Sequence, residues 1–149
     1  MRRAILIAIG FGLGVTSAYA GDELDEALLQ SLSSVPMVDV LECKVGDERS
    51  LAGLNSTIQF SGGKTNKKTK KALAAFEERV VYWSAVLDVA TETDLRAGQV
   101  ALEERQAERK KKLSEMSVFE QSVYLAKRDY PCDDIFEDAR KSKKKANKK

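Results

Sequence analysis

The sequence predicts a small, mostly α-helical single domain: a bundle of four or five helices with one long Gly-rich loop, clasped by one disulfide bond. Three observations predict this class. An apolar stripe at helical spacing runs through the middle of the chain, a helix-start signal follows it, and the chain has two cysteines. Apolar residues that recur every three to four positions line one face of a helix, so their spacing indicates the fold class.

Residues 1–20 predict a secretory signal peptide that is not part of the fold. Two arginines precede an apolar run from residue 4 to residue 15, and small residues stand at Ala18 and Ala20. A basic start, a short apolar run and a small-residue cleavage site are the three parts of such a signal. The run is too short to cross a bilayer of about 30 Å as a helix. We therefore expect cleavage after Ala20 and a periplasmic or secreted protein.

The remaining chain divides into a helical domain, residues 21–139, and a Lys-rich tail, residues 140–149. The domain carries 16 basic and 23 acidic residues, whereas the tail carries seven basic residues and no acidic one. Runs of like charge repel each other and stay solvated, so the tail is expected to be disordered.

Three segments precede the longest expected helix. Residues 22–33 place three leucines at helical spacing behind an acidic first turn, and these acids suit the positive end of a helix. Residues 37–44 form a second element, either a helix or a strand, and Pro36 favours the helix slightly. From Gly46 to about residue 66 turn residues are frequent, which predicts the long loop, with a brief strand over 57–60 as an alternative within it.

The clearest element is a long helix over residues 69–90, in which Trp83 is expected to anchor the core. Its apolar stripe has spacings of three and four and consists of Leu73, Phe76, Val80, Trp83, Leu87 and Ala90. The next helix begins at a cap, Thr91 or Thr93, and runs to about Leu113. Its apolar face is thin, so we expect it to project beyond the core or to lie on the surface.

Two further helices are expected near the C-terminus. Ser117 and Glu120 match a capping box, in which each side chain binds the backbone amide of the other residue, and an apolar face follows until Pro131. Cys132 then opens a last helix with two aspartates in its first turn. These acids have a sufficient structural role at the positive end of that helix.

Cys43 and Cys132 are expected to form an intramolecular disulfide bond. In an oxidising compartment, two cysteines of one small domain most often pair with each other. Pairing between two chains and a free thiol are the alternatives. The sequence has no histidine, and two cysteines alone cannot fill the four positions of a zinc site, so no metal is expected.

The sequence offers no catalytic motif, and we expect neither enzymatic activity nor a cofactor. The lack of histidine removes Ser-His-Asp and Cys-His sites. Gly62-Gly63-Lys64-Thr65 is similar to the end of a phosphate-binding loop, but Ile58 stands where the first glycine is required. A carboxylate pair of the kind that glycosidases use stays open as a catalytic alternative.

Two groups of residues are candidates for partner binding. Tyr82 and Tyr124 fall off the main apolar stripes, so they are expected to be exposed and to form a protein-binding surface. A lysine cluster precedes the long helix and includes Lys67, Lys68, Lys70 and Lys71. This cluster and the basic tail are candidate contacts for anionic lipid or lipid A phosphates. Nucleic acid is not expected, because neither basic stretch has interleaved aromatic residues for base stacking.

The function predicted first is an exported, non-enzymatic binding protein: an inhibitor, an immunity-type protein or an accessory subunit that binds an envelope or secreted protein. A rigid helical body with an acidic face is suited to block a target enzyme whose active site has a basic rim, because complementary charge speeds association. The first alternative is a periplasmic chaperone active in acid, where protonation of 23 carboxylates leaves a large positive charge. The second alternative is a small envelope enzyme that uses carboxylates.

Overall fold

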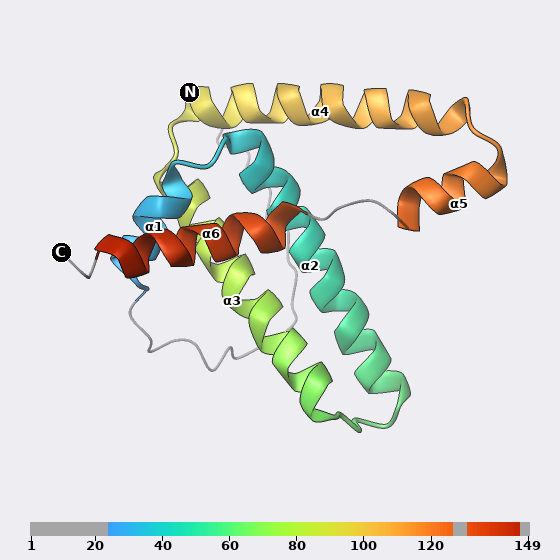
Figure 1. Cartoon of the computed structure of the whole chain (residues 1–149), viewed down its shortest axis with the longest axis horizontal. Helices are drawn as coiled ribbons and strands as arrows, with labels where there is room; N and C mark the ends of the chain where they lie inside the picture. The colour runs from blue at the N-terminus through green and yellow to red at the C-terminus, as the bar shows by residue number, and fades with distance from the viewer. Residues whose placement is uncertain (1–23, 127–130, 147–149) are drawn as a thin grey trace, which may run out of the picture.

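The computed structural model describes residues 24–126 and 131–146, and every regular element in these ranges is an α-helix (Figure 1). The helices are α1 (Glu26–Ser33), α2 (Met37–Phe60), α3 (Lys67–Val89), α4 (Glu92–Ser114), α5 (Val118–Ala126) and α6 (Pro131–Ala146). The predicted class, a small all-α domain, is confirmed, with six helices in the described ranges where four or five were expected. The predicted signal peptide lies outside the described residues.

The helices form a compact body from which two parts project (Figure 1). α2 and α3 pack as an antiparallel hairpin, and α1 and α6 lie across its base, where α1 contacts α3 and α6. α4 packs on the first part of α2 and then extends beyond it, with α5 at its far end. We call residues 58–71 the hairpin tip and residues 103–126 the arm. The projection of α4 agrees with its thin apolar face.

The core lies at the base of the hairpin, and Trp83 is its centre, as predicted. The Trp83 ring is fully buried and meets the Phe136 ring edge-on, with centroids 5.7 Å apart. The other buried apolar side chains come from α1, α2, α3 and α6: Leu28, Leu32, Val40, Cys43, Tyr82, Val86, Cys132 and Ala139. Four helices therefore share one core, and neither α4 nor α5 adds a residue to it.

The predicted disulfide bond between Cys43 and Cys132 is present. Both cysteines are buried, and the bond joins the first half of α2 to the first turn of α6. The two ends of the helical domain are thus linked covalently at the core.

The long Gly-rich loop was a wrong prediction. α2 continues to Phe60, so the connection to α3 is only residues 61–66, and the segment 57–60 is helical, not a strand. The inner face of α2 does have helical spacing, through Val40, Cys43, Asp47, Leu51, Leu54 and Ile58. Asp47 interrupts the apolar pattern and hid it. Among the residues that the structure describes, only Gly62 and Gly63 have positive φ, 69° and 79°, as the tight turn requires.

α4 approaches α2 closely at Gly98. A Cβ atom at this position would lie 2.6 Å from the Cγ of Met37, so a larger residue would push the helices apart. The predicted cap is confirmed at the start of α4, where the Thr91 hydroxyl accepts a hydrogen bond of 3.1 Å from the Asp94 amide. Close packing thus holds the first half of α4 and leaves the second half to project.

The tail was predicted to be disordered from residue 140, but α6 continues to Ala146. Arg140 forms ion pairs with Glu137 and with Glu78 of α3, and Lys141 pairs with Asp138 at 3.1 Å. Acids in the first turn and basic residues after them also suit the helix dipole. These local pairs offset the repulsion between the basic side chains. Residues 147–149 lie outside the described range.

Candidate functional site

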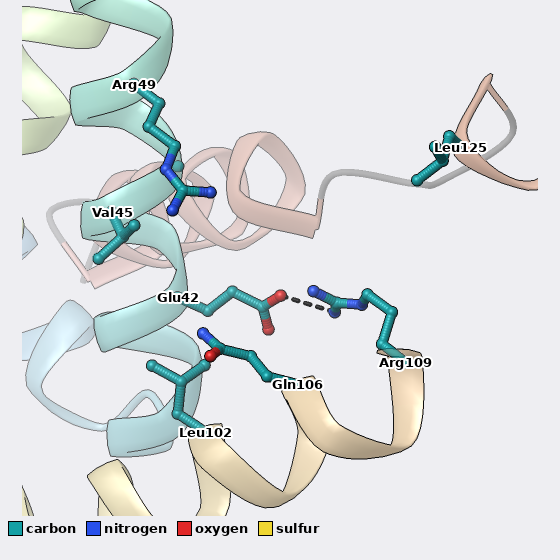
Figure 2. Close-up of a pocket in the computed structure, with 8 residues that line it drawn as sticks. Glu42, Val45, Arg49, Leu102, Gln106, Arg109 and Leu125 are labelled. Carbon is teal, nitrogen blue, oxygen red and sulfur yellow. Dashed lines mark hydrogen bonds and ion pairs between the residues drawn. The ribbon is translucent and has the colours of Figure 1, made fainter. Parts of the chain in front are cut away.

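An open recess of about 460 Å³ lies where α2, α4 and α5 face one another (Figure 2). It is lined by Glu42, Val45, Gly46 and Arg49 of α2, by Leu102, Gln106 and Arg109 of α4, and by Leu125 of α5. This volume is in the range of sites that hold a small molecule or a few side chains of a partner. Helices therefore bound the recess on three sides.

Charged side chains tie the two walls of the recess together. Glu42 accepts hydrogen bonds from Arg105 at 2.8 Å and from Arg109 at 2.7 Å, and Arg105 also donates to Asp39 at 2.7 Å. Burial raises the pKa of Glu42, but the hydrogen bonds and charges of the two arginines outweigh it and hold this pKa below the ordinary value of 4.5. Glu42 is therefore ionised at neutral pH and helps fix α4 to α2.

Arg49 adds an exposed positive charge to the same recess. Figure 2 shows its guanidinium group directed into the recess, beside Val45. The structure shows no ion pair between Arg49 and a carboxylate in the described ranges. The wall of α2 thus presents an apolar side chain and a cation that a carboxylate of a ligand could pair with.

The apolar side of α5 faces away from α4, the helix that precedes it. Its polar side faces α4, where Gln121 donates to the carbonyl oxygens of Leu113 at 2.9 Å and Met116 at 3.1 Å. Val118 and Phe119 on the other side are 80% and 77% exposed. A surface helix ordinarily buries its apolar stripe and exposes its polar one. The apolar face of α5, defined by Val118, Phe119, Val123 and Leu125, is therefore largely exposed in the described part of the chain, most of all at Val118 and Phe119.

The capping box at the start of α5 is confirmed. Glu120 accepts hydrogen bonds from the Ser117 amide at 2.8 Å and from the Ser117 hydroxyl at 2.7 Å, and the Glu120 amide donates back at 3.3 Å. The hydroxyl and amide donors of Ser117 hold the pKa of Glu120 below its usual range. This cap fixes the direction in which α5 leaves the turn after α4.

The predicted tyrosine surface is not brought together by the fold. Tyr82 is only 7% exposed, its hydroxyl accepts a hydrogen bond of 3.0 Å from the Asp25 amide, and its ring packs edge-on against Phe136. The expectation of an exposed Tyr82 was wrong, because α1 and α6 cover a second flank of α3. Tyr124 is half-buried in the arm, with the Nζ of Lys112 5.0 Å from its ring centroid.

The predicted lysine cluster is exposed at the hairpin tip. Lys67 and Lys68 begin α3, Lys70 completes its first turn, and Lys71 follows. The end of α6, which holds the first part of the basic tail, lies at a different end of the molecule (Figure 1). The two basic stretches are therefore separate surfaces and cannot contact one small ligand together.

A buried ion network was missed by the sequence analysis. Asp47 is fully buried and accepts hydrogen bonds from the Nε and Nη2 of Arg79, at 3.1 and 2.8 Å, and from the Nε1 of Trp83, at 2.8 Å. Arg79 also pairs with Asp133 of α6. The network joins α2, α3 and α6 beside the disulfide bond. Because it satisfies the buried groups mutually, it acts to hold the fold.

Comparison with protein-family models, with curated proteins and with solved structures finds no match for this chain. Within the described ranges, no helix combines the length and the apolarity needed to cross a membrane. The same ranges contain no group of three or more His, Cys, Asp or Glu side chains that could hold a metal ion.

The Glu42 ion pairs predict an acid-sensitive contribution to stability. Because the folded-state pKa of Glu42 lies below its unfolded value, the contribution is present above about pH 4.5 and is lost as pH falls through the folded pKa. Glu42→Gln is expected to cost about 1–2 kcal/mol at pH 7 and less at pH 3, where part of Glu42 becomes protonated in the folded protein. Urea unfolding of both proteins at the two pH values measures this, with the exposed Glu108→Gln as control. An equal loss at both pH values would contradict it.

Proposed function

We propose that this chain is an exported, non-catalytic binding protein. It captures a helical segment of another protein in the recess between α2, α4 and α5. The observation that carries the proposal is the outward apolar face of α5. An exposed apolar face of this kind marks a surface that binds a partner. The recess beside it provides the depth that anchors a few large side chains.

The chemistry of the recess defines the partner. Val45 and Leu102 offer apolar contact on two walls, and Leu125 offers it on the third. Arg49 adds a positive charge, which favours a segment that carries an acidic side chain. An amphipathic helix with apolar side chains at positions i, i+3, i+4 and i+7 matches such a groove. The proposed ligand is therefore an amphipathic, acidic helix of an envelope or secreted protein.

Site-specific crosslinking tests this function. A photoreactive amino acid replaces Phe119 in the chain expressed in its own host, and the crosslinked product is identified at pH 7. The same amino acid at Phe60 is the control, since both phenylalanines are exposed and they belong to different projecting parts, the hairpin tip and the arm. We expect one dominant partner, in fixed stoichiometry, from the Phe119 position only.

Binding of the purified partner then distinguishes the recess and the adjoining apolar face of α5 from other surfaces. Phe119→Ser and Arg49→Glu are each expected to weaken binding by about tenfold or more, as for side chains at the centre of an interface. Phe60→Ser should leave the affinity unchanged. Because the substituted side chains are exposed, each variant is expected to have the same unfolding midpoint as the parent protein. An unchanged affinity of Phe119→Ser would refute the proposal.

The Glu42 ion pairs favour one alternative, a chaperone active in acid. Protonation of Glu42 removes its pairing with Arg105 and Arg109 and so weakens the contact between α4 and α2. The same crosslinking at about pH 3 tests it. Many unrelated proteins captured only in acid would support the chaperone in place of the dedicated binder.

A further inference from the structure

We propose a second binding surface: the hairpin tip docks on an anionic lipid bilayer, with Phe60 inserted among the lipid headgroups and the surrounding lysines against their phosphates. This inference does not depend on the recess or its partner. It stands on the exposure of one aromatic side chain, on the charge around it, and on the projection of the tip from the body.

Phe60 is the last residue of α2 and is 91% exposed. Asp47 is the last fully buried residue of α2, and Phe60 lies 13 residues beyond it. Thirteen residues span about 20 Å along a helix. The fold gains no packing from this side chain. Figure 1 shows the tip projecting away from α1, α6 and the arm. A flat surface could therefore meet the tip without touching the other described helices.

The charge around Phe60 is of one sign. Residues 50–76 contain five lysines and no acidic residue, and all five lysines are exposed: Lys64, Lys67, Lys68, Lys70 and Lys71. Clusters of four to eight basic residues are attracted to membranes that contain anionic lipid. An aromatic or aliphatic side chain within the cluster adds insertion into the headgroup layer. The hairpin tip has both the basic cluster and the exposed aromatic side chain, within one turn and the two helix ends beside it.

These lysines act against the local stability of α3. Three of them occupy the first turn of that helix and Lys71 follows directly; the turn has no acidic residue, and positive charge there opposes the helix dipole. Asn66 caps the helix by accepting a hydrogen bond of 2.8 Å from the Thr69 amide, so the turn has its cap without the lysines. Neutralisation by lipid phosphates removes the repulsion. Contact with an anionic surface therefore stabilises the start of α3, where the lysines are unfavourable in the isolated protein.

Vesicle sedimentation tests the proposal. The full chain is expressed in a host that processes it, its N-terminus is checked by mass spectrometry, and it is mixed with vesicles of about 30% phosphatidylglycerol in phosphatidylcholine. We expect binding to these vesicles, weak binding to pure phosphatidylcholine, and a loss of binding between about 0.1 and 0.5 M salt. Retained residues 1–20 would instead bind both kinds of vesicle, since that segment is apolar.

Matched variants locate the contact. Lys67→Gln, Lys68→Gln and Lys70→Gln together are expected to lower the partition coefficient about 30-fold or more. The same change at Lys110, Lys111 and Lys112 of the arm removes equal charge and should have little effect. Phe60→Ser is expected to lower binding about fivefold to tenfold, whereas Phe119→Ser should not.

Three results would overturn the proposal: unchanged binding of either tip variant, an equal loss in the arm variant, or tighter binding of the tip to a nucleic acid than to the vesicles. The proposed recess function has a separate readout. Phe119→Ser tests partner affinity and Phe60→Ser tests lipid affinity, so each proposal can fail while the other holds.

Discussion

Asp47→Asn is expected to lower the free energy of unfolding by about 3–5 kcal/mol, because it leaves the buried guanidinium of Arg79 without its main carboxylate. The carboxylate also accepts the indole hydrogen bond of Trp83, and an asparagine can turn only one oxygen toward these three donors. Urea unfolding followed by fluorescence measures the loss. Trp83 is the single tryptophan and lies in the core, so its emission reports on the network directly.

Asp133→Asn is the matched control for this prediction. Asp133 pairs with the same guanidinium, but its side chain is 64% exposed, and water replaces a lost partner at such a site. Its substitution is expected to cost under about 1 kcal/mol. The double change Asp47→Leu and Arg79→Met should recover part of the Asp47→Asn loss, since no charge then stays buried. Equal losses for Asp47→Asn and Asp133→Asn would show that burial does not decide the effect.

Removal of the disulfide bond is the other large effect expected. Cys43 and Cys132 are 89 residues apart, and a cross-link that closes a loop of this length stabilises the folded state by about 4–5 kcal/mol in the chain-entropy model. The double variant Cys43→Ser and Cys132→Ser should therefore unfold at much lower urea than the parent. The loss of two buried apolar sulfur atoms adds to the effect.

Reductant provides a second measurement that needs no variant. The parent protein in urea with a reductant should unfold at a much lower urea concentration than the oxidised parent, and at a somewhat higher one than the double variant, because the reduced parent keeps both buried sulfur atoms. The double variant itself should not respond to the reductant, which is the control. A parent protein whose unfolding midpoint is unaffected by full reduction would contradict the prediction.

The fold class was predictable because three helices carry local signals. The stripe through Trp83, the cap at Thr91 and the capping box at Ser117 are each contained within a few turns of chain. The disulfide was predictable from the cysteine count and the expected compartment. α2 was not, because Asp47 stands at a core position and its partners, Arg79 and Trp83, lie 32 and 36 residues away. A buried charge looks like a solvent-facing residue until its counterion is known.

The candidate site was less predictable than the fold. The recess depends on how α4 leaves α2, which rests on the close approach at Gly98 and on the reach of Arg105 and Arg109 to Glu42. None of these contacts has a short-range pattern. The burial of Tyr82 was also unpredictable, since its position on α3 does not reveal that α1 and α6 cover it. Only the lysine cluster was visible as a surface from the sequence.

The disulfide bond also gives the chain the topology of a covalent ring. Residues 43–132 form a closed circle that contains α3, α4 and α5, with α1 and the end of α6 as branches. A protease that cuts the turn between α4 and α5 opens this circle and releases no fragment. A single nick in the arm therefore adds one water molecule to the chain, and the two pieces separate only after the disulfide bond is reduced.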